Sequence, residues 1–184
     1  MQVIETDLPG VVLVDPLLFN DSRGHFLEIY HSRRYHDCGF PSEFVQQNMS
    51  FSTRGVLRGL HYQLGRPQGK LVMVLQGEIF DVAADIRKDS PTFGRWTGAL
   101  LSAATYRQIY IPEGFAHGFC VTGETALVLY LCTDFYAPEE ERGIRWDDPM
   151  LDIAWPIMNP ILSGKDAEYP FLGDALHYNL HGCR

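Results

Sequence analysis

The sequence predicts a single, mainly β domain of the sandwich or barrel class. About ten short runs of β-branched and aromatic residues recur along the 184 residues, bounded by Gly, Pro, Asp or Ser. Only two stretches favour a helix, and no linker, repeat or low-complexity segment divides the chain. A chain of this size that is 46% hydrophobic and 21% charged can bury a sizeable core.

The N-terminal half predicts strands around one short helix. Residues 11–14 and 26–30 carry the aliphatic and aromatic side chains typical of strands. Residues 32–38 predict a helix, with Ser32 as the candidate N-cap and Gly39 just past its end. Residues 44–47 and 56–63 return to strand. In a regular strand Arg58 and His61 point to opposite faces, so a site that uses both needs a bulge, a twist or a wall built from several strands.

The C-terminal half begins with two β-rich runs, 71–76 and 79–86. The Gly77-Glu78 pair between them predicts a tight hairpin. Further strands are expected at 96–102, 108–111, 115–121 and 126–133, with a short helical turn at 163–167. The resulting domain spans 1–184, with a C-terminal tail from about 171.

Composition excludes several classes of protein. The net charge of −8 argues against a broad nucleic-acid surface. No apolar run approaches the ~20 residues of a membrane span, and the N-terminus lacks the order of a signal peptide, so we expect no membrane association and a cytoplasmic location. The cysteines show no CxxC spacing, which predicts reduced thiols without a structural disulfide: Cys38, Cys120, Cys132 and Cys183.

Polar residues inside apolar strands are candidates for a site. An inward ionisable group must be paired or face a cavity, and alternate strand positions line the interior of a barrel. The candidates are Lys70, Asp81, Asp85, His117 and Tyr130. Taken singly, Asp85 next to Arg87 predicts an ion pair, and Tyr130 in its apolar strand favours core packing. Asp81 and His117 stay open between a structural role and a pocket wall.

The most informative segment is 56–72. It places Arg58, His61 and Lys70 within about a dozen positions, bounded by apolar strand residues. A cation, an imidazole and a second cation are the groups needed to hold an anionic, carbonyl-bearing substrate beside a base.

Ordered blocks along the chain resemble one enzyme family. The sequence is similar to the dTDP-4-dehydrorhamnose 3,5-epimerases, cupin-type jelly-roll enzymes, from about residue 11 to 170. The matching blocks are 21–24 with Phe26 and Glu28, 44–46 with Asn48, 57–63, 68–70, 80–82 with Asp85, 90–94, 111–119, and Trp146 with 148–149. One departure is Met49, where many relatives have histidine.

The resemblance implies epimerisation at C3 and C5 of dTDP-4-dehydro-6-deoxy-D-glucose, which gives dTDP-4-dehydro-L-rhamnose in dTDP-L-rhamnose biosynthesis. Loss of either proton gives an enolate on O4, and inversion needs a base and an acid on opposite faces of the ring. By resemblance His61 is the base, Tyr130 the acid and Lys70 the cation near the enolate oxygen. Asp166 is the carboxylate that orients His61.

The resemblance also implies a set of substrate-binding residues. Arg23 and Arg58 offer planar forks for phosphate or sugar oxygens, and Phe26 offers an aromatic surface. Tyr136 is equally consistent with packing and with substrate contact. The full set is Arg23, Phe26, Glu28, Gln46, Asn48, Arg58, His117 and Tyr136.

No metal or other cofactor is expected. Metal-binding cupins carry a His-x-His pair, whereas His61 is followed by Tyr62 and Gln63. The alternatives are an epimerase that inverts only C3 or only C5, a sugar-binding cupin without catalysis, and a metal-dependent cupin oxygenase. The remaining histidines are expected at the surface: His25, His31, His36, His177 and His181.

The family resemblance further implies a homodimer that exchanges N-terminal segments. An open jelly roll exposes strand edges that soluble proteins cover or pair. Residues 11–18 are apolar enough to serve as an exchanged strand, and Arg23 and Glu28 would then complete the pocket of the partner.

Overall fold

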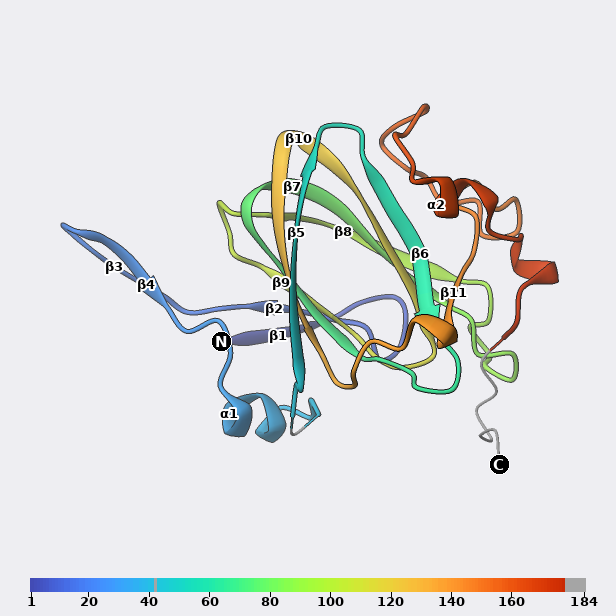
Figure 1. Ribbon diagram of the computed structural model, residues 1–184. Coiled ribbons are helices and arrows are strands. Elements are labelled where there is room, and N and C mark those ends of the chain that lie inside the picture. The colour runs from blue at the N-terminus through green and yellow to red at the C-terminus, as the bar shows by residue number, and fades with distance from the viewer. Residues whose placement is uncertain (42, 178–184) are drawn as a thin grey trace.

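The computed structural model describes residues 1–41 and 43–177. The predictions of a surface position for His181 and a reduced thiol for Cys183 lie outside the described residues. Two layers of antiparallel strands face each other, with two short helices at the periphery (Figure 1). The prediction of a mainly β fold is confirmed. In chain order the elements are β1 (Gln2–Glu5), β2 (Val12–Asp15), β3 (Leu18–Asp21), β4 (Gly24–Leu27), α1 (Ser32–Asp37), β5 (Gln46–Thr53), β6 (Leu57–Gln63), β7 (Lys70–Asp85), β8 (Trp96–Ser102), β9 (Gln108–Ile111), β10 (Phe115–Cys132), η1 (Pro138–Glu140), β11 (Glu141–Gly143), α2 (Gly164–Glu168) and η2 (Leu172–Asp174).

Two long strands, β7 and β10, run through both layers. The first part of β7 pairs with β9 and with the second part of β10, which also pairs with β5. The second part of β7 pairs with β8 and with the first part of β10, which also pairs with β6. One layer is therefore β1-β2-β9-β7-β10-β5 and the other is β8-β7-β10-β6-β11.

The predicted hairpin at Gly77-Glu78 is wrong, because β7 continues through both residues. Gly77 has φ +79°, and a Cβ at this position would lie 1.7 Å from the carbonyl oxygen of Thr125. Gly77 therefore allows a bend within one continuous strand rather than a turn between two strands. Opposite this bend, β10 is also one strand, with residues 122–125 bulging between the paired Val121 and Ala126.

Smaller corrections concern element ends. The N-cap of α1 is His31, whose side chain accepts from the backbone N–H of Arg34, rather than Ser32. The strand expected at 44–47 begins at residue 46 and continues to 53 as β5. The short helix near 163–167 is present, with Ser163 as the N-cap of α2.

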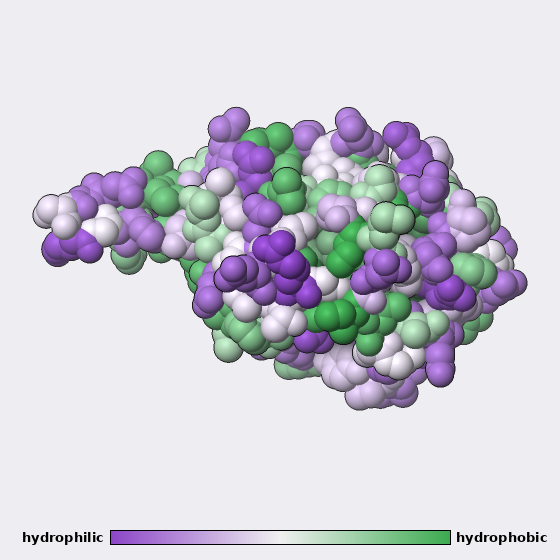
Figure 2. Space-filling model, turned by 90° about the horizontal axis from the view of Figure 1, so that it is seen from above, coloured by the Kyte–Doolittle hydropathy of each residue, from purple (hydrophilic) through white to green (hydrophobic). Residues whose placement is uncertain are grey.

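The strand expected at 26–30 ends at Leu27 as β4, and β4 pairs with β3 in a projecting hairpin, here called the arm. The arm pairs with no other strand in the described part of the chain and extends away from the two layers (Figure 1). Phe19 and Phe26 leave 56% and 70% of their surfaces exposed on it, and Figure 2 shows apolar side chains along the arm with a hydrophilic tip. This much exposed apolar surface on one chain is typical of an interaction site.

The core lies between the layers. Val72, Ile79, Phe119 and Val128, which come from both parts of β7 and β10, belong to one buried cluster. A second cluster includes Leu172, so the C-terminal segment packs on the domain at this point, although the sequence predicted a tail from about 171. Among the described residues the cysteines are free thiols: Cys38, Cys120 and Cys132. No helix in residues 1–41 or 43–177 is long and apolar enough to cross a membrane.

Candidate active site

A pocket of about 240 Å³ opens between the two layers where the apolar core ends. Along β7 the inward positions read Val74, Val72 and then Lys70, and along β10 they read Val128 and then Tyr130. Polar side chains thus replace apolar ones on the same strand faces. The lining comprises Asn48, Met49, Ser50, Arg58, His61, Tyr62, Gln63, Gln68, Lys70, His117, Phe119, Tyr130, Cys132, Tyr136 and Glu141.

A bulge in β6 turns Arg58 and His61 toward the same pocket. His61 pairs with His117 and Arg58 pairs with Phe119, so β6 has two residues where β10 has one. Gly59 in this bulge has φ +113°, and a Cβ there would lie 2.6 Å from the backbone of Gly118. The extra residue resets the alternation of faces, so of the arrangements that the sequence left open for a site using both side chains, the structure shows the bulge.

Asp166 holds His61 from behind the pocket. The Nε2 atom of His61 lies 2.5 Å from Oδ1 of Asp166, which is only 3% exposed. Burial raises the pKa of Asp166, but hydrogen bonds from His61, Ser163 and the backbone N–H of Gly59 outweigh burial and lower it overall. The carboxylate therefore stays ionised, and it contacts the imidazole as the family resemblance implied.

Lys70 and Tyr130 enter the pocket from the opposite layer. Burial lowers the pKa of the Lys70 ammonium, while the negative charges of Asp81 and Glu141 oppose this change. The hydroxyl of Tyr130 lies 2.8 Å from Oγ of Ser50. Burial raises the pKa of Tyr130 well above its ordinary value, so the phenol keeps its proton at neutral pH.

Of the two buried aspartates on β7, Asp81 contacts a residue of the pocket lining, whereas Asp85 has a structural role. Nε2 of His117 lies 2.9 Å from Oδ2 of Asp81, which is fully buried, so Asp81 holds the imidazole that lines the pocket. Asp85 forms the predicted ion pair with Arg87, and Nη2 of Arg87 lies 2.7 Å from Oδ2 of Asp85. It also accepts hydrogen bonds from two neighbouring hydroxyl groups, on Ser90 and Thr92. Asp85 is therefore structural.

Five of the predicted substrate-binding residues lie at or beside the pocket: Asn48, Arg58, His117 and Tyr136 line it, and Gln46 lies next to it. Arg58 lines the pocket, donating through Nε to Ser52 over 3.0 Å and through Nη2 to the carbonyl oxygen of Phe51 over 3.5 Å. Gln46 does not line the pocket, but its amide donates to Asn48 over 2.9 Å and its Oε1 accepts from the backbone N–H of Tyr136 over 2.8 Å. Both of those partners line the pocket.

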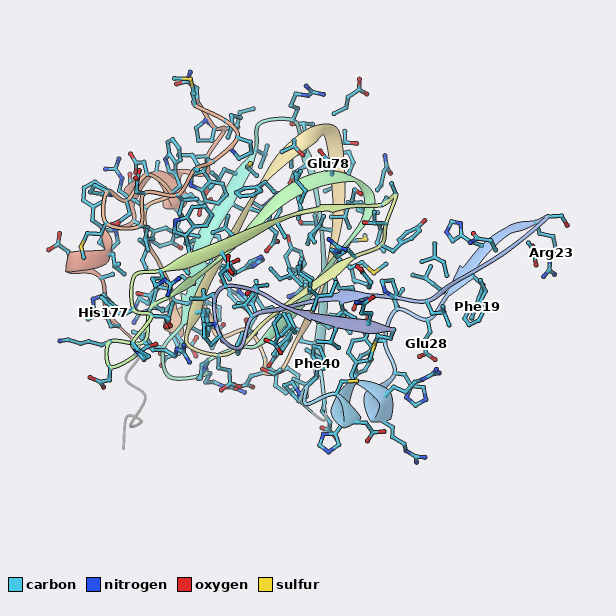
Figure 3. All side chains as sticks on the ribbon, turned by 180° about the vertical axis from the view of Figure 1, so that it is seen from behind. Phe19, Arg23, Glu28, Phe40, Glu78 and His177 are labelled. Atoms are coloured by element: carbon cyan, nitrogen blue, oxygen red, sulfur yellow. The ribbon has the colours of Figure 1, made fainter. Side chains whose placement is uncertain are left out.

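Three predicted residues lie elsewhere. Arg23 is at the tip of the arm, with 88% of its side chain exposed and paired with Asp21 (Figure 3). Phe26 also lies on the arm, and Glu28 follows it and pairs with Arg34. Within one chain none of the three reaches the pocket, because the arm extends away from it.

Sequence reasoning missed several residues around the pocket. Glu141 lines it, accepts a hydrogen bond from the Tyr136 hydroxyl and forms an ion pair with Lys165. Glu141 lies in the charged run 139–142, which in sequence is indistinguishable from a solvated face. The ring of Tyr169 packs edge-on against His61, with 5.7 Å between centroids. Only the folding of the C-terminal segment onto β6 places Tyr169 there.

Within the described ranges, no group of three or more His, Cys, Asp or Glu side chains is arranged to hold a metal ion. His61 and His117 are adjacent across β6 and β10, but each imidazole uses Nε2 to contact a carboxylate, on Asp166 and Asp81 respectively.

Comparisons with known proteins show what the whole chain is similar to. The family model described as dTDP-4-dehydrorhamnose 3,5-epimerase matches residues 5–174. A dTDP-4-dehydrorhamnose 3,5-epimerase of Pseudomonas aeruginosa is 52% identical over 177 residues, covering 95% of this chain and 98% of the relative. The crystal structure of a dTDP-6-deoxy-D-glucose-3,5-epimerase of Legionella pneumophila in complex with dTDP-4-keto-L-rhamnose has a TM-score of 0.92 and 48% identity, covering 94% of this chain and 93% of that one. A 4-keto-6-deoxy sugar epimerase of the novobiocin gene cluster of Streptomyces spheroides has a TM-score of 0.93 and 36% identity, covering 100% and 96%.

Proposed function

The chain belongs to the dTDP-4-dehydrorhamnose 3,5-epimerase family, and from this premise we propose that His61, Tyr130 and Lys70 carry the epimerisation of its substrate. The protein is an isomerase that converts dTDP-4-dehydro-6-deoxy-D-glucose to dTDP-4-dehydro-L-rhamnose in the biosynthesis of dTDP-L-rhamnose. The C4 ketone of this sugar acidifies the hydrogens on C3 and C5. Each inversion therefore removes a proton from one face of the ring and returns one to the other.

The observation that carries the proposal is that His61 and Tyr130 line opposite walls of the pocket. His61 lies on β6 in one layer, whereas Tyr130 lies on the part of β10 that belongs to the other layer. The two layers meet behind them, where the rings of His117 and Tyr130 are 6.4 Å apart between centroids. A sugar ring between the walls would present one face to an imidazole held by Asp166 and the other to a protonated phenol.

Lys70 supplies the charge that the enolate needs. It enters the pocket from the same layer as Tyr130, two residues before the buried Val72. A cation that is partly shielded from water stabilises a developing oxyanion more strongly than an exposed one. We assign Lys70 to the O4 oxygen, which carries the negative charge of both enolates.

The pocket of one chain is small for the whole substrate. Its volume of about 240 Å³ is below the ~300–1,000 Å³ of ordinary ligand pockets. We place the sugar inside it and the nucleotide at its mouth, near Arg58, Asn48 and Tyr136. In a homodimer the arm of the partner would cover this mouth and bring a second arginine, an aromatic ring and a carboxylate, from Arg23, Phe26 and Glu28.

The test is isotope exchange. Incubation with dTDP-4-keto-6-deoxyglucose in deuterated water, followed by NMR, should show deuterium at both C3 and C5 together with the L-rhamno product. Label at one carbon alone would indicate a mono-epimerase. No exchange at either carbon would refute the proposed proton chemistry.

A further inference from the structure

Ser163 lies behind Asp166, on the side of the carboxylate away from His61. Its Oγ accepts a hydrogen bond from the backbone N–H of Asp166 over 3.1 Å and donates its proton to Oδ2 of the same residue over 2.7 Å. The other oxygen, Oδ1, faces Nε2 of His61 and the N–H of Gly59. The Ser163 hydroxyl thus forms hydrogen bonds with both the backbone and the side chain of Asp166. Ser163 does not line the pocket.

We propose that Ser163 is a positioning residue for the epimerisation, acting through Asp166 on His61. This inference rests on the proposed role of His61 as the base. The terminal torsion of an aspartate is broad, so a carboxylate held at one oxygen only can rotate. The proton donated to Oδ2 fixes that torsion and leaves Oδ1 directed at the imidazole.

The same hydrogen bond also favours the charged form of the carboxylate, because donors to an anion stabilise it. It is one of the contacts that lower the pKa of Asp166 against the effect of burial. Ser163 therefore helps to keep the Asp166 carboxylate both ionised and oriented toward His61.

A competing explanation is that Ser163 only caps α2, which has five residues. Three substitutions separate the two roles. Ser163→Thr keeps the hydroxyl donor and the cap. Ser163→Asp keeps an equally good cap, but its carboxylate cannot donate and brings a like charge beside Asp166. Ser163→Ala removes both functions.

For positioning, kcat of Ser163→Ala should fall by about 10- to 100-fold, the range expected for losing a hydrogen bond to a charged group. The value of KM should change little, since Ser163 is outside the lining. Ser163→Thr should restore kcat, whereas Ser163→Asp should fall at least as far as Ser163→Ala. A capping role alone predicts near wild-type kcat for Ser163→Asp and would overturn the inference.

Double variants give an independent readout. In an Asp166→Asn background the further change Ser163→Ala should alter kcat by less than about two-fold, because residues that act in series are not additive. Full additivity would overturn the inference. Glu168→Gln, an exposed change on the same helix, serves as the matched control and should leave kcat unchanged.

Failure of the proposed function is distinguishable from failure of this inference. If His61→Asn keeps near wild-type activity, the base assignment is wrong and the role of Ser163 falls with it. If His61→Asn is inactive while folded Ser163→Ala has wild-type kcat, only the role of Ser163 is refuted.

Discussion

Replacing Tyr130 by Phe tests the two-wall geometry most directly. Phenylalanine keeps the ring and its contacts with His117 and Phe119, whose centroids lie 6.4 and 6.3 Å from that of Tyr130. The substitution removes only the hydroxyl, and with it the 2.8 Å hydrogen bond to Ser50. The variant should therefore fold, with a stability loss of about 1 kcal/mol for one neutral hydrogen bond.

The effect on turnover should be much larger than the effect on stability. Burial raises the pKa of Tyr130 well above 10.0, so the phenol is protonated throughout the working range of pH and can act as an acid. Loss of a general acid lowers the rate by about 10²- to 10⁴-fold, which raises the activation free energy by about 2.7–5.4 kcal/mol. The loss should fall on reprotonation, because His61 and Asp166 are untouched.

The assay measures exchange and product in one deuterated sample. Deprotonation by His61 should survive better than inversion, so Tyr130→Phe should incorporate deuterium at C3 or C5 faster than it forms epimerised sugar. Equal and undiminished rates of both would refute the reasoning. Tyr130 would then be only a wall of the site, and Tyr136, whose hydroxyl donates to Glu141 over 3.1 Å, or a water would deliver the proton.

Four further predictions follow from the same structure. His61→Asn should lower turnover by about 10²- to 10⁴-fold with the fold intact by circular dichroism, and a folded variant within a few-fold of wild type would contradict the base assignment. Exhaustive chelation should leave activity unchanged, whereas activity lost to a chelator and restored by one added ion would contradict metal independence. Light scattering at micromolar concentration should report a dimer, and a variant lacking residues 18–27 should lose nucleotide affinity; a wild-type monomer would contradict the exchanged arm. Burial raises the pKa of Asp85, but hydrogen bonds from Arg87 and two hydroxyl groups lower it overall below 3.8, so the carboxylate contributes its full stability above that pH and loses it as pH falls through the lower folded pKa. Asp85→Asn should therefore cost about 3 kcal/mol of stability at neutral pH and weaken the loss of stability in acid, and urea titrations that show the same acid dependence as wild type would contradict this.

Several features of the site were legible in the sequence. A cation, an imidazole and a second cation in one β-rich segment identified Arg58, His61 and Lys70, and the structure brings all three to one pocket. The two-residue period of a strand showed that Arg58 and His61 could share a site only through a bulge, a twist or a wall of several strands, and the structure has a bulge at Gly59.

Other features could not be predicted from local pattern. A glycine between two β-rich runs is compatible with a hairpin and with a bend in one continuous strand. The choice at Gly77 depends on residues 122–125, which bulge from the partner strand. Glu141 and Lys165 are ordinary surface charges in sequence, and only their meeting at the pocket mouth distinguishes them.

The position of the arm shows the same limit at a larger scale. Family motifs identified Arg23, Phe26 and Glu28, yet the fold of one chain carries them away from the pocket. Whether they bind substrate is therefore decided by assembly and not by the single chain.

By itself the sequence determined the β class and most of the chemical groups of the site, because these depend on side-chain type and on a period of two residues. Tertiary structure decided which distant groups act together. His61 and Asp166 are 105 positions apart in the chain, and they meet because the C-terminal segment folds back along β6, where the backbone of Leu57 bonds to that of Ile161. The pattern of neighbouring residues in the sequence cannot predict such a contact, since it forms only when the C-terminal segment packs against β6.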